Sequence, residues 1–285
     1  MYISSACVKH EKIKDSIEEL ARNGFVDIEL SGGTKYYEGY EDDLLKLKDK
    51  YNLNYLLHNY FPPPKEEFIL NLASLNNDIY QKSIQHCERA LALSKKLGSK
   101  KFGFHAGYFI DIATKEIGKN ISRTSLFDKG KAVERFCQGY QHLKGVAGDV
   151  ELYLENNVLS SSNAKTFQGE NPLMLTDYRG YVELKTFIDF KLLLDVAHLN
   201  VSATTLGLDF VEQLEKLLLI SDYVHLSDND GSHDQARCFN TESKILDILK
   251  AHDFTDKIIT TETYGAISDI KLSQLIIKRS LGIKG

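Results

Sequence analysis

The sequence predicts an α/β protein of the (β/α)8 TIM-barrel class, built as a single domain over residues 1–285. Short apolar runs alternate eight times with amphipathic segments, a pattern typical of parallel strands joined by right-handed helical crossovers. A length of 285 residues suits one barrel, since such domains commonly span ~200–250 residues or more. No linker rich in Pro, Gly or Ser divides the chain, and no GxGxxG follows the first strand. The sequence therefore favours a closed barrel over an open nucleotide-binding sheet.

Eight segments are expected to form the strands, because each is short, apolar or β-branched, and bounded by polar residues or glycine. They are residues 1–6, 26–32, 54–61, 101–107, 150–157, 191–199, 222–229 and 257–265. The segments between them have helical spacing, as in the first, where Ile13, Ile17 and Leu20 share one face. The expected helices are 11–23, 41–51, roughly 66–97, 127–146, 180–188, 208–219, 241–252 and 268–282.

Composition excludes several classes of protein. A hydrophobic fraction of 42% is ample for a buried core, and no apolar run approaches the ~20 residues that span a bilayer. With 35 basic and 40 acidic residues the net charge is −5, so no global basic field attracts nucleic acid. The four cysteines are scattered and the start lacks a secretory signal. We therefore expect a cytoplasmic protein with reduced thiols and no thiolate metal site.

Ionisable residues recur near the C-terminal ends of seven of the eight predicted strands. In an α/β barrel these ends open onto the one face that holds the active site. Independent helix caps and core histidines would not all fall at the same end of successive strands, so the set as a whole indicates a functional site. Its members are Glu29, His58, His105, Glu155, Asp195 with His198, His225 and Glu262.

The alternation of side chains along a strand predicts that these residues point into the barrel. In the fifth strand Leu152 and Leu154 face one side and Glu155 the other. If the leucines pack on the outer helices, the acids and imidazoles gather in the barrel mouth. Clustered carboxylates repel one another and are costly to desolvate, an objection that a divalent cation removes. Oxygen and imidazole donors suit Mn²⁺, Zn²⁺, Co²⁺ or Mg²⁺.

Some single residues have simpler structural interpretations. A lone histidine near a strand end is commonly just hydrogen-bonded, which is the simpler interpretation of His105 by itself. An aspartate after a strand is commonly a helix N-cap, as Asp228 could be. Glu29 could be an interior salt-bridge partner, and its role stays open. The three prolines after the third strand have two equally good interpretations. They could simply stiffen a loop, or they could form a rigid wall beside the site, where Tyr60 or Phe61 contacts substrate.

A series of motifs resembles the xylose-isomerase-like TIM-barrel superfamily, which unites sugar-phosphate isomerases and epimerases with the endonuclease IV group. The motifs run nearly end to end, and their order and spacing make the resemblance specific. They are GFVDIELSGG, LHNYF, FHAG, LENN, LLLDVAHL, VHLSDNDG and TTETYG. The resemblance implies a (β/α)8 barrel with its active site at the C-terminal strand ends.

The ketose epimerase branch holds one divalent metal on Glu, Asp, His and Glu from successive strand ends. The resemblance implies that Glu155, Asp195, His225 and Glu262 are these ligands, and that His198 contacts substrate. Glu155 and Glu262 would then also be catalytic, together with His198.

The endonuclease branch binds additional zinc ions through two earlier histidines, which match His58 and His105. That branch also has an Asp-x-His pair after the seventh strand, where this chain has Asp234-Gln235-Ala236 and lacks the histidine. His58, His105 and Asp234 are therefore candidates for an additional metal or for substrate, without a complete three-metal site. The arginine that some epimerases use after the seventh strand has no obvious counterpart either.

The predicted function is a divalent-metal-dependent isomerase or epimerase of a small sugar or sugar phosphate, working by proton transfer through an enediolate. We expect one divalent cation, no organic cofactor, a small-molecule sugar as partner, and neither nucleic acid nor membrane. The oligomeric state stays open, a homo-oligomer included. The alternatives are an endonuclease IV-like phosphodiesterase on abasic DNA, a metal-dependent dehydratase of the same barrel family, and a sugar-binding barrel without activity.

Overall fold

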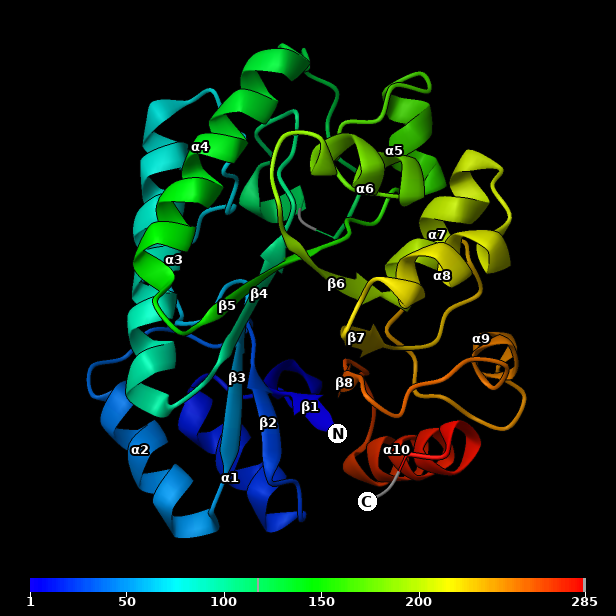
Figure 1. Cartoon of the computed structure of the whole chain (residues 1–285). Helices are drawn as coiled ribbons and strands as arrows, with labels where there is room; N and C mark the ends of the chain where they lie inside the picture. The colour runs from blue at the N-terminus through cyan, green and yellow to red at the C-terminus, as the bar shows by residue number, and fades with distance from the viewer. Residues whose placement is uncertain (117, 284–285) are drawn as a thin grey trace.

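Eight parallel strands form a closed barrel in the computed structural model, which describes residues 1–116 and 118–283 (Figure 1). The strands pair in chain order, and β8 pairs back onto β1 to close the ring. This confirms the predicted (β/α)8 class. The strands are β1 Tyr2–Ser4, β2 Asp27–Leu30, β3 Asn54–His58, β4 Lys101–His105, β5 Glu151–Glu155, β6 Lys191–Asp195, β7 Tyr223–Leu226 and β8 Ile258–Thr261.

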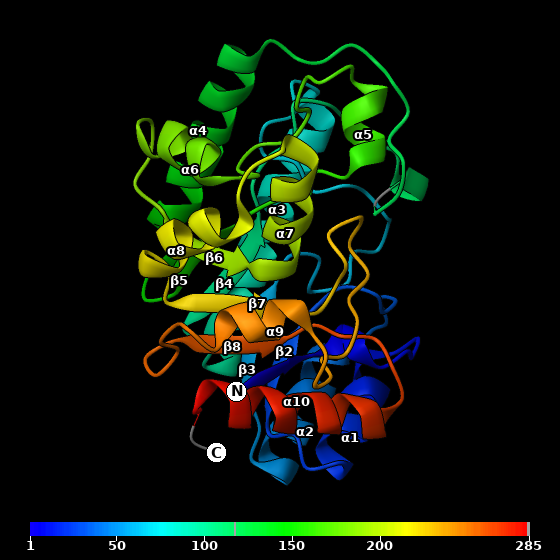
Figure 2. The ribbon, with the colours of Figure 1, turned by 90° about the vertical axis from the view of Figure 1, so that its right-hand side faces the viewer.

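Helices surround the barrel, and the last of them lies beside the first strand (Figures 1 and 2). Gln274 of this last helix donates a hydrogen bond to the carbonyl of Tyr2 at 3.4 Å, which ties the two ends of the fold together. The helices are α1 Ile13–Arg22, α2 Tyr40–Tyr51, α3 Asn77–Leu97, α4 Lys129–Ala147, α5 Ser161–Thr166, α6 Tyr178–Lys185, α7 Val196–Leu206, α8 Phe210–Leu219, α9 Lys244–Leu249 and α10 Ile267–Leu281, with short 3-10 turns at Ser5–Cys7 and Thr114–Glu116.

The sheet separates two apolar layers, as the alternation along the strands predicts. Leu152 and Leu154 pack outward into the large core beneath the helices. Tyr153 and Tyr223 point inward and fill the lower barrel with Leu193. Further along the strands, toward their C-terminal ends, the inward positions become polar. The apolar lower layer therefore forms a floor on which the polar residues of the barrel mouth rest.

The third helix is shorter than predicted. The sequence predicts one helix over roughly 66–97, whereas α3 begins only at Asn77. In residues 66–76 the side chain of Asn71 bonds to backbone groups of neighbouring loops, and the side chain of Asn76 caps the helix. Short amide side chains that bond to the backbone compete with helix formation. The predicted start is therefore wrong.

The sixth strand is also shorter than predicted, because a helix begins inside the segment 191–199. The strand ends at Asp195, and α7 begins at the next residue. The carboxylate of Asp195 accepts a hydrogen bond from the backbone N–H of His198 at 2.7 Å. This cap satisfies one of the free N–H groups at the helix start, so strand and helix join without a loop. The short helix α5 was likewise not predicted.

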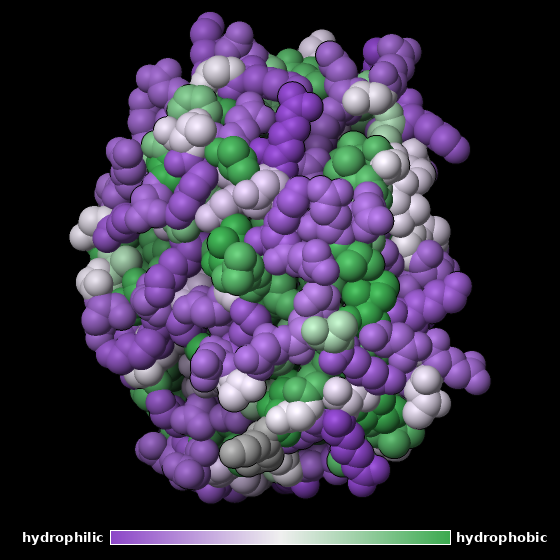
Figure 3. All heavy atoms as spheres, turned by 45° about the vertical axis from the view of Figure 1, so that its right-hand side comes forward, coloured by the Kyte–Doolittle hydropathy of each residue, from purple (hydrophilic) through white to green (hydrophobic). Residues whose placement is uncertain are grey.

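Polar side chains dominate the face drawn in Figure 3, where apolar patches are small and mostly bordered by polar ones. Among the described residues, no helix is at once long and apolar enough to cross a membrane.

Candidate metal centre

The C-terminal ends of the strands open into a cavity of about 780 Å³. This volume lies in the range of small-molecule sites. Its walls come from the loops after β1, β2, β3, β7 and β8. Predicted site residues that line it are His58, Tyr60, His105, Glu155, Asp195, His198, Asp234 and Glu262.

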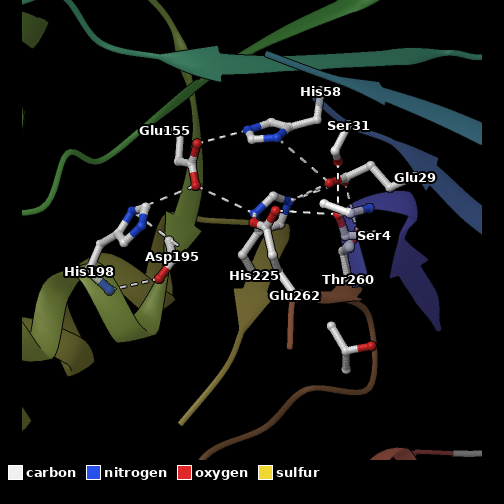
Figure 4. A network of polar contacts seen from close by, with 12 residues as sticks. Ser4, Glu29, Ser31, His58, Glu155, Asp195, His198, His225, Thr260 and Glu262 are labelled. Carbon is white, nitrogen blue, oxygen red and sulfur yellow. Dashed lines mark hydrogen bonds and ion pairs between the residues drawn. The ribbon is translucent and has the colours of Figure 1, made fainter. Parts of the chain in front are cut away.

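Four of the predicted residues converge below this cavity (Figure 4). Glu155, Asp195, His225 and Glu262 stand at or just after the ends of β5, β6, β7 and β8. One donor atom from each lies within 4.8 Å of the donor atoms of the other three. The first three are almost completely buried, and the side chain of Glu262 is 22% exposed. The structure thus brings together the set that the resemblance implies.

Unpartnered buried atoms mark the centre of this group. Glu155 Oε1 and His225 Nδ1 lie 3.4 Å apart, and neither has a hydrogen-bond partner in the part of the chain that the structure describes. Glu262 Oε2 lies 3.4 Å from the same nitrogen. Because buried polar atoms are almost always satisfied, these atoms fit a cation held among them. Three carboxylates and one imidazole suit the divalent ions named above.

Two carboxylates of the group are held in the ionised form. Burial acts to raise the pKa of Glu155, but His105 and His58 lower it more, so it stays well below its ordinary value. Burial also opposes ionisation of Glu262, yet the hydrogen bond and charge of His225 lower its pKa to about 2. Both carboxylates are therefore available as metal ligands and as proton acceptors at neutral pH.

Asp195 differs from them, because burial raises its pKa to about 6. Its backbone is fixed by Asn156, whose side chain accepts a bond from Asp195 N at 2.7 Å and donates one to Asp195 O at 2.9 Å. The carbonyl of Asn156 also accepts from His198 Nδ1 at 3.0 Å. Asn156 was not among the predicted site residues, although it directly follows Glu155 in the LENN motif.

His198 turns its other ring nitrogen toward the cavity. Its Nε2 lies 3.4 Å from an oxygen of Asp234, on the loop after β7. Because Nδ1 is engaged by the backbone, Nε2 is the nitrogen that can reach a ligand in the cavity. The structure therefore brings His198 and Asp234 together at the edge of the metal group.

His58 and His105 meet the opposite side of the central carboxylate. His58 Nε2 is 2.8 Å and His105 Nδ1 is 3.1 Å from Glu155 Oε2. Burial lowers the pKa of His105 to about 4, although the charge of Glu155 opposes this shift. For His58, burial is outweighed by Glu155, and the pKa is raised. Both histidines thus belong to the cluster rather than to separate core positions.

The two aromatic candidates for substrate contact, Tyr60 and Phe61, lie in different environments. Tyr60 lines the cavity, and its hydroxyl accepts a hydrogen bond from Leu70 N at 3.1 Å. Phe61 is fully buried and packs edge-on against Tyr40 in the core beneath the helices. The expectation that Phe61 contacts substrate is therefore corrected, since its side chain faces away from the cavity. His10, on the loop after β1, lines the cavity instead; lying outside any strand, it gave no signal.

A closed (β/α)8 barrel with a carboxylate and imidazole cluster at its C-terminal mouth is the class that fold and site define. The chain belongs to the xylose isomerase-like TIM barrel family, whose model matches residues 17–278. No curated protein matches it in sequence.

Solved structures agree with this assignment. A D-tagatose 3-epimerase-like protein has a TM-score of 0.72 and 19% identity, covering 99% of this chain and 96% of its own. L-ribulose 3-epimerase has a TM-score of 0.68 and 15% identity, covering 99% and 94%. Endonuclease IV from Thermus thermophilus has a TM-score of 0.60 and 15% identity, covering 99% and 98%. At these identities the likeness shows the fold alone.

Proposed function

We propose that this protein is a divalent-metal-dependent epimerase or isomerase of a small sugar or sugar phosphate. The observation that carries the proposal is the convergence of Glu155, Asp195, His225 and Glu262 donor atoms within 4.8 Å, beneath a cavity of about 780 Å³. Two of the similar structures are of epimerases or epimerase-like proteins, which supports a sugar over other small molecules.

A bound divalent cation would supply Lewis-acid polarisation of a substrate carbonyl, which acidifies the neighbouring C–H bond. Glu155 and Glu262 enter from different strands, and their low pKa values keep both ionised. One carboxylate takes the proton from carbon to give an enediolate, and the other returns a proton to the same or the neighbouring carbon. His198, whose Nδ1 is fixed by Asn156, holds a substrate hydroxyl through Nε2. General acid–base catalysis of this kind contributes ~10²–10⁴-fold.

Deuterium exchange tests the proposal. The purified chain is analysed for metal content, loaded with Mn²⁺, and incubated in D₂O with a panel of ketoses and their phosphates. The expected result is about one ion per chain and deuterium incorporated beside the carbonyl of at least one sugar. A dehydratase would show loss of water after the same proton abstraction, so mass spectrometry separates the two outcomes.

A matched pair of variants assigns the chemistry to the site. Glu155→Gln should lower exchange by at least ~10²-fold. Glu151→Gln makes the same change at the other end of β5, where Glu151 pairs with Lys101 at 2.6 Å, and should leave exchange unchanged. A Glu155→Gln variant with normal exchange, or a wild-type protein without metal or exchange, contradicts the proposal.

A metal-dependent phosphodiesterase is the second candidate, favoured by the position of His58 and His105 on Glu155 Oε2. Two or three ions per chain and cleavage of abasic DNA would support it. Ala236 lies in the cavity wall, on the loop where the endonuclease branch places a metal-binding histidine. Arg237 is 53% exposed and pairs with Asp230, so it adds no charge to the cavity for a phosphate backbone.

A further inference from the structure

Glu29 is a buried acid directly beneath the metal group. It points inward from β2 and is fully buried. The hydroxyl of Tyr223 donates a hydrogen bond to Glu29 Oε2, and that of Thr260 donates another at 3.0 Å. The mechanism above does not use this carboxylate, and an isolated buried charge is costly. The role of Glu29 must therefore be inferred from the groups that it contacts.

One partner is the proposed metal ligand His225 (Figure 4). Both oxygens of Glu29 lie 3.1 Å from His225 Nε2. On the other side of the ring, Nδ1 lies 3.4 Å from Glu155 Oε1 and 3.4 Å from Glu262 Oε2. The His225 imidazole thus lies between the Glu29 carboxylate, which its Nε2 faces, and the proposed metal ligands Glu155 and Glu262, which its Nδ1 faces.

This arrangement selects one form of the imidazole. A nitrogen that binds a metal must carry no proton, so the proton of the neutral ring has to reside on the other nitrogen. A carboxylate has no proton to donate and therefore only accepts hydrogen bonds, as Glu29 Oε2 does from the hydroxyls of Tyr223 and Thr260. The carboxylate therefore favours a proton on Nε2 and leaves Nδ1 free.

We propose that Glu29 is a positioning residue that holds the His225 ring with its proton on Nε2, so that Nδ1 is presented to the cation. Carboxylate partners of this kind orient metal-binding histidines, and their loss typically costs 10–100-fold in metal affinity. The inference rests on the proposed metal centre. In this view Glu29 is a partner of His225 rather than a ligand, because both its oxygens lie 3.1 Å from His225 Nε2 and Oε2 also accepts from Tyr223 and Thr260. Its Oε1 has no hydrogen-bond partner among the described residues, and Glu29, His58 and His225 present donor atoms within 4.8 Å of one another, so loss of a second ion is among the outcomes of the test.

The test compares Zn²⁺ affinity in the full-length chain, measured by competition with a chelating dye, for the wild type, Glu29→Gln and Thr260→Val. Glu29→Gln keeps the size of the side chain but places an amide NH₂ against His225 Nε2 or against the two hydroxyls. It should weaken Zn²⁺ binding ~10–100-fold. Thr260→Val removes one of the two hydroxyl donors to the same carboxylate but leaves the contact between Glu29 and His225, so it should weaken Zn²⁺ binding less than Glu29→Gln does.

Nitrogen-15 spectra of the histidines in Zn²⁺-loaded wild-type protein report which ring nitrogen carries the proton, independently of the affinity of the Glu29 and Thr260 variants. The His225 signal, assigned with His225→Gln, should show a proton on Nε2 that is protected from exchange. A Zn²⁺-loaded ring with its proton on Nδ1 overturns the inference, as does equal Zn²⁺ affinity in Glu29→Gln and wild type. Loss of a second bound ion in Glu29→Gln also overturns it, because Glu29 would then be a ligand. If the wild type binds neither Zn²⁺ nor Mn²⁺, the proposed function fails as well.

Discussion

Glu155 divides its two carboxylate oxygens between different partners. Oε2 contacts His58 and His105, whereas Oε1 faces His225 Nδ1 at 3.4 Å. The first two contacts fix the carboxylate, and the second oxygen stays available to a cation or a substrate proton. One residue can therefore be both rigid and reactive, because rigidity and reactivity use different atoms.

At the same scale, His198 should act on substrate rather than on the metal. His198→Gln removes the imidazole facing the cavity but leaves the four proposed ligands in place. We expect unchanged metal content and a fall in kcat/KM of ~10²-fold. Metal analysis and steady-state kinetics on the identified sugar check this, and a variant that loses its ion would show instead that His198 is a ligand.

Individual residues also show what sequence could and could not predict at the site. The four converging residues were predictable as members of the strand-end set, because each stands near the end of a recognisable strand and strand parity sets the direction of its side chain. Their selection from that set as proposed metal ligands came from the family resemblance. Asn156 and His10 were not, since Asn156 acts through backbone bonds and His10 lies on a loop. Phe61 was misplaced because a proline-rich segment has no regular periodicity from which to infer a direction.

At the scale of elements, the end of β4 is closely packed. Gly107 follows this strand, and a Cβ placed there would lie 2.6 Å from Ala73 Cβ and 3.1 Å from a ring carbon of Phe136. Both neighbours are fully buried and cannot move aside without disturbing the core. The chain therefore needs glycine here for space, because the end of β4 lies close against Ala73 in the segment before α3 and against Phe136 of α4.

Gly107→Ala should lower the free energy of unfolding by ~1–3 kcal/mol through overpacking. Gly145→Ala is the matched control, because that glycine lies in α4 with no atom within 4 Å of the added Cβ. Alanine there should stabilise by ~0.5–1 kcal/mol, as expected for a helix interior. Urea unfolding of the three proteins checks both values, and two substitutions of equal effect would refute the packing argument.

Elements also differ in how well their ends could be predicted. The alternation of apolar runs and amphipathic segments located all eight strands and most helices. The start of α3 and the β6–α7 junction were misplaced, because side-chain bonds to the backbone at Asn76 and Asp195 set these boundaries. Such bonds depend on geometry that composition and periodicity do not contain.

For the whole molecule, acid stability should depend on His86. This α3 residue is fully buried, and its Nε2 contacts the carbonyl of Asn59 at 3.0 Å. Burial lowers its pKa from the ordinary 6.5 to about 4. Between pH 6.5 and pH 4, His86 binds a proton in the unfolded chain but stays unprotonated in the folded chain. The free energy of unfolding therefore falls as the pH falls toward 4. The loss at pH 5 should be about 2 kcal/mol, from roughly 1.4 kcal/mol per pKa unit.

Urea unfolding at pH 7 and pH 5 measures this effect. His86→Gln can retain a donor to Asn59 but does not titrate, so its stability should fall less between the two pH values, by about 2 kcal/mol. The other histidines titrate alike in both proteins and cancel in the comparison. If the free energy of unfolding fell equally in both proteins, His86 would have the same pKa in the folded and unfolded chain, and the prediction would be wrong.

Ion binding should also stabilise the whole barrel, because the proposed ligands come from four different strands. A ligand that binds only the folded state at 100 times its Kd adds ~2.7 kcal/mol. Thermal unfolding should therefore shift to higher temperature with added Mn²⁺ and return with a chelator. Glu155→Gln should respond less, and a wild type with no response would contradict the metal centre.

The direct junction between β6 and α7 has a consequence for how an ion reaches the centre. Asp195 ends the strand and caps the helix in one residue, so displacing it would unravel the first helical turn. Glu262, by contrast, follows β8 on a loop, and its side chain is the most exposed of the four at 22%. We therefore expect an ion at the proposed centre to enter and leave past Glu262, because the proposed donors on β5, β6 and β7 are almost completely buried.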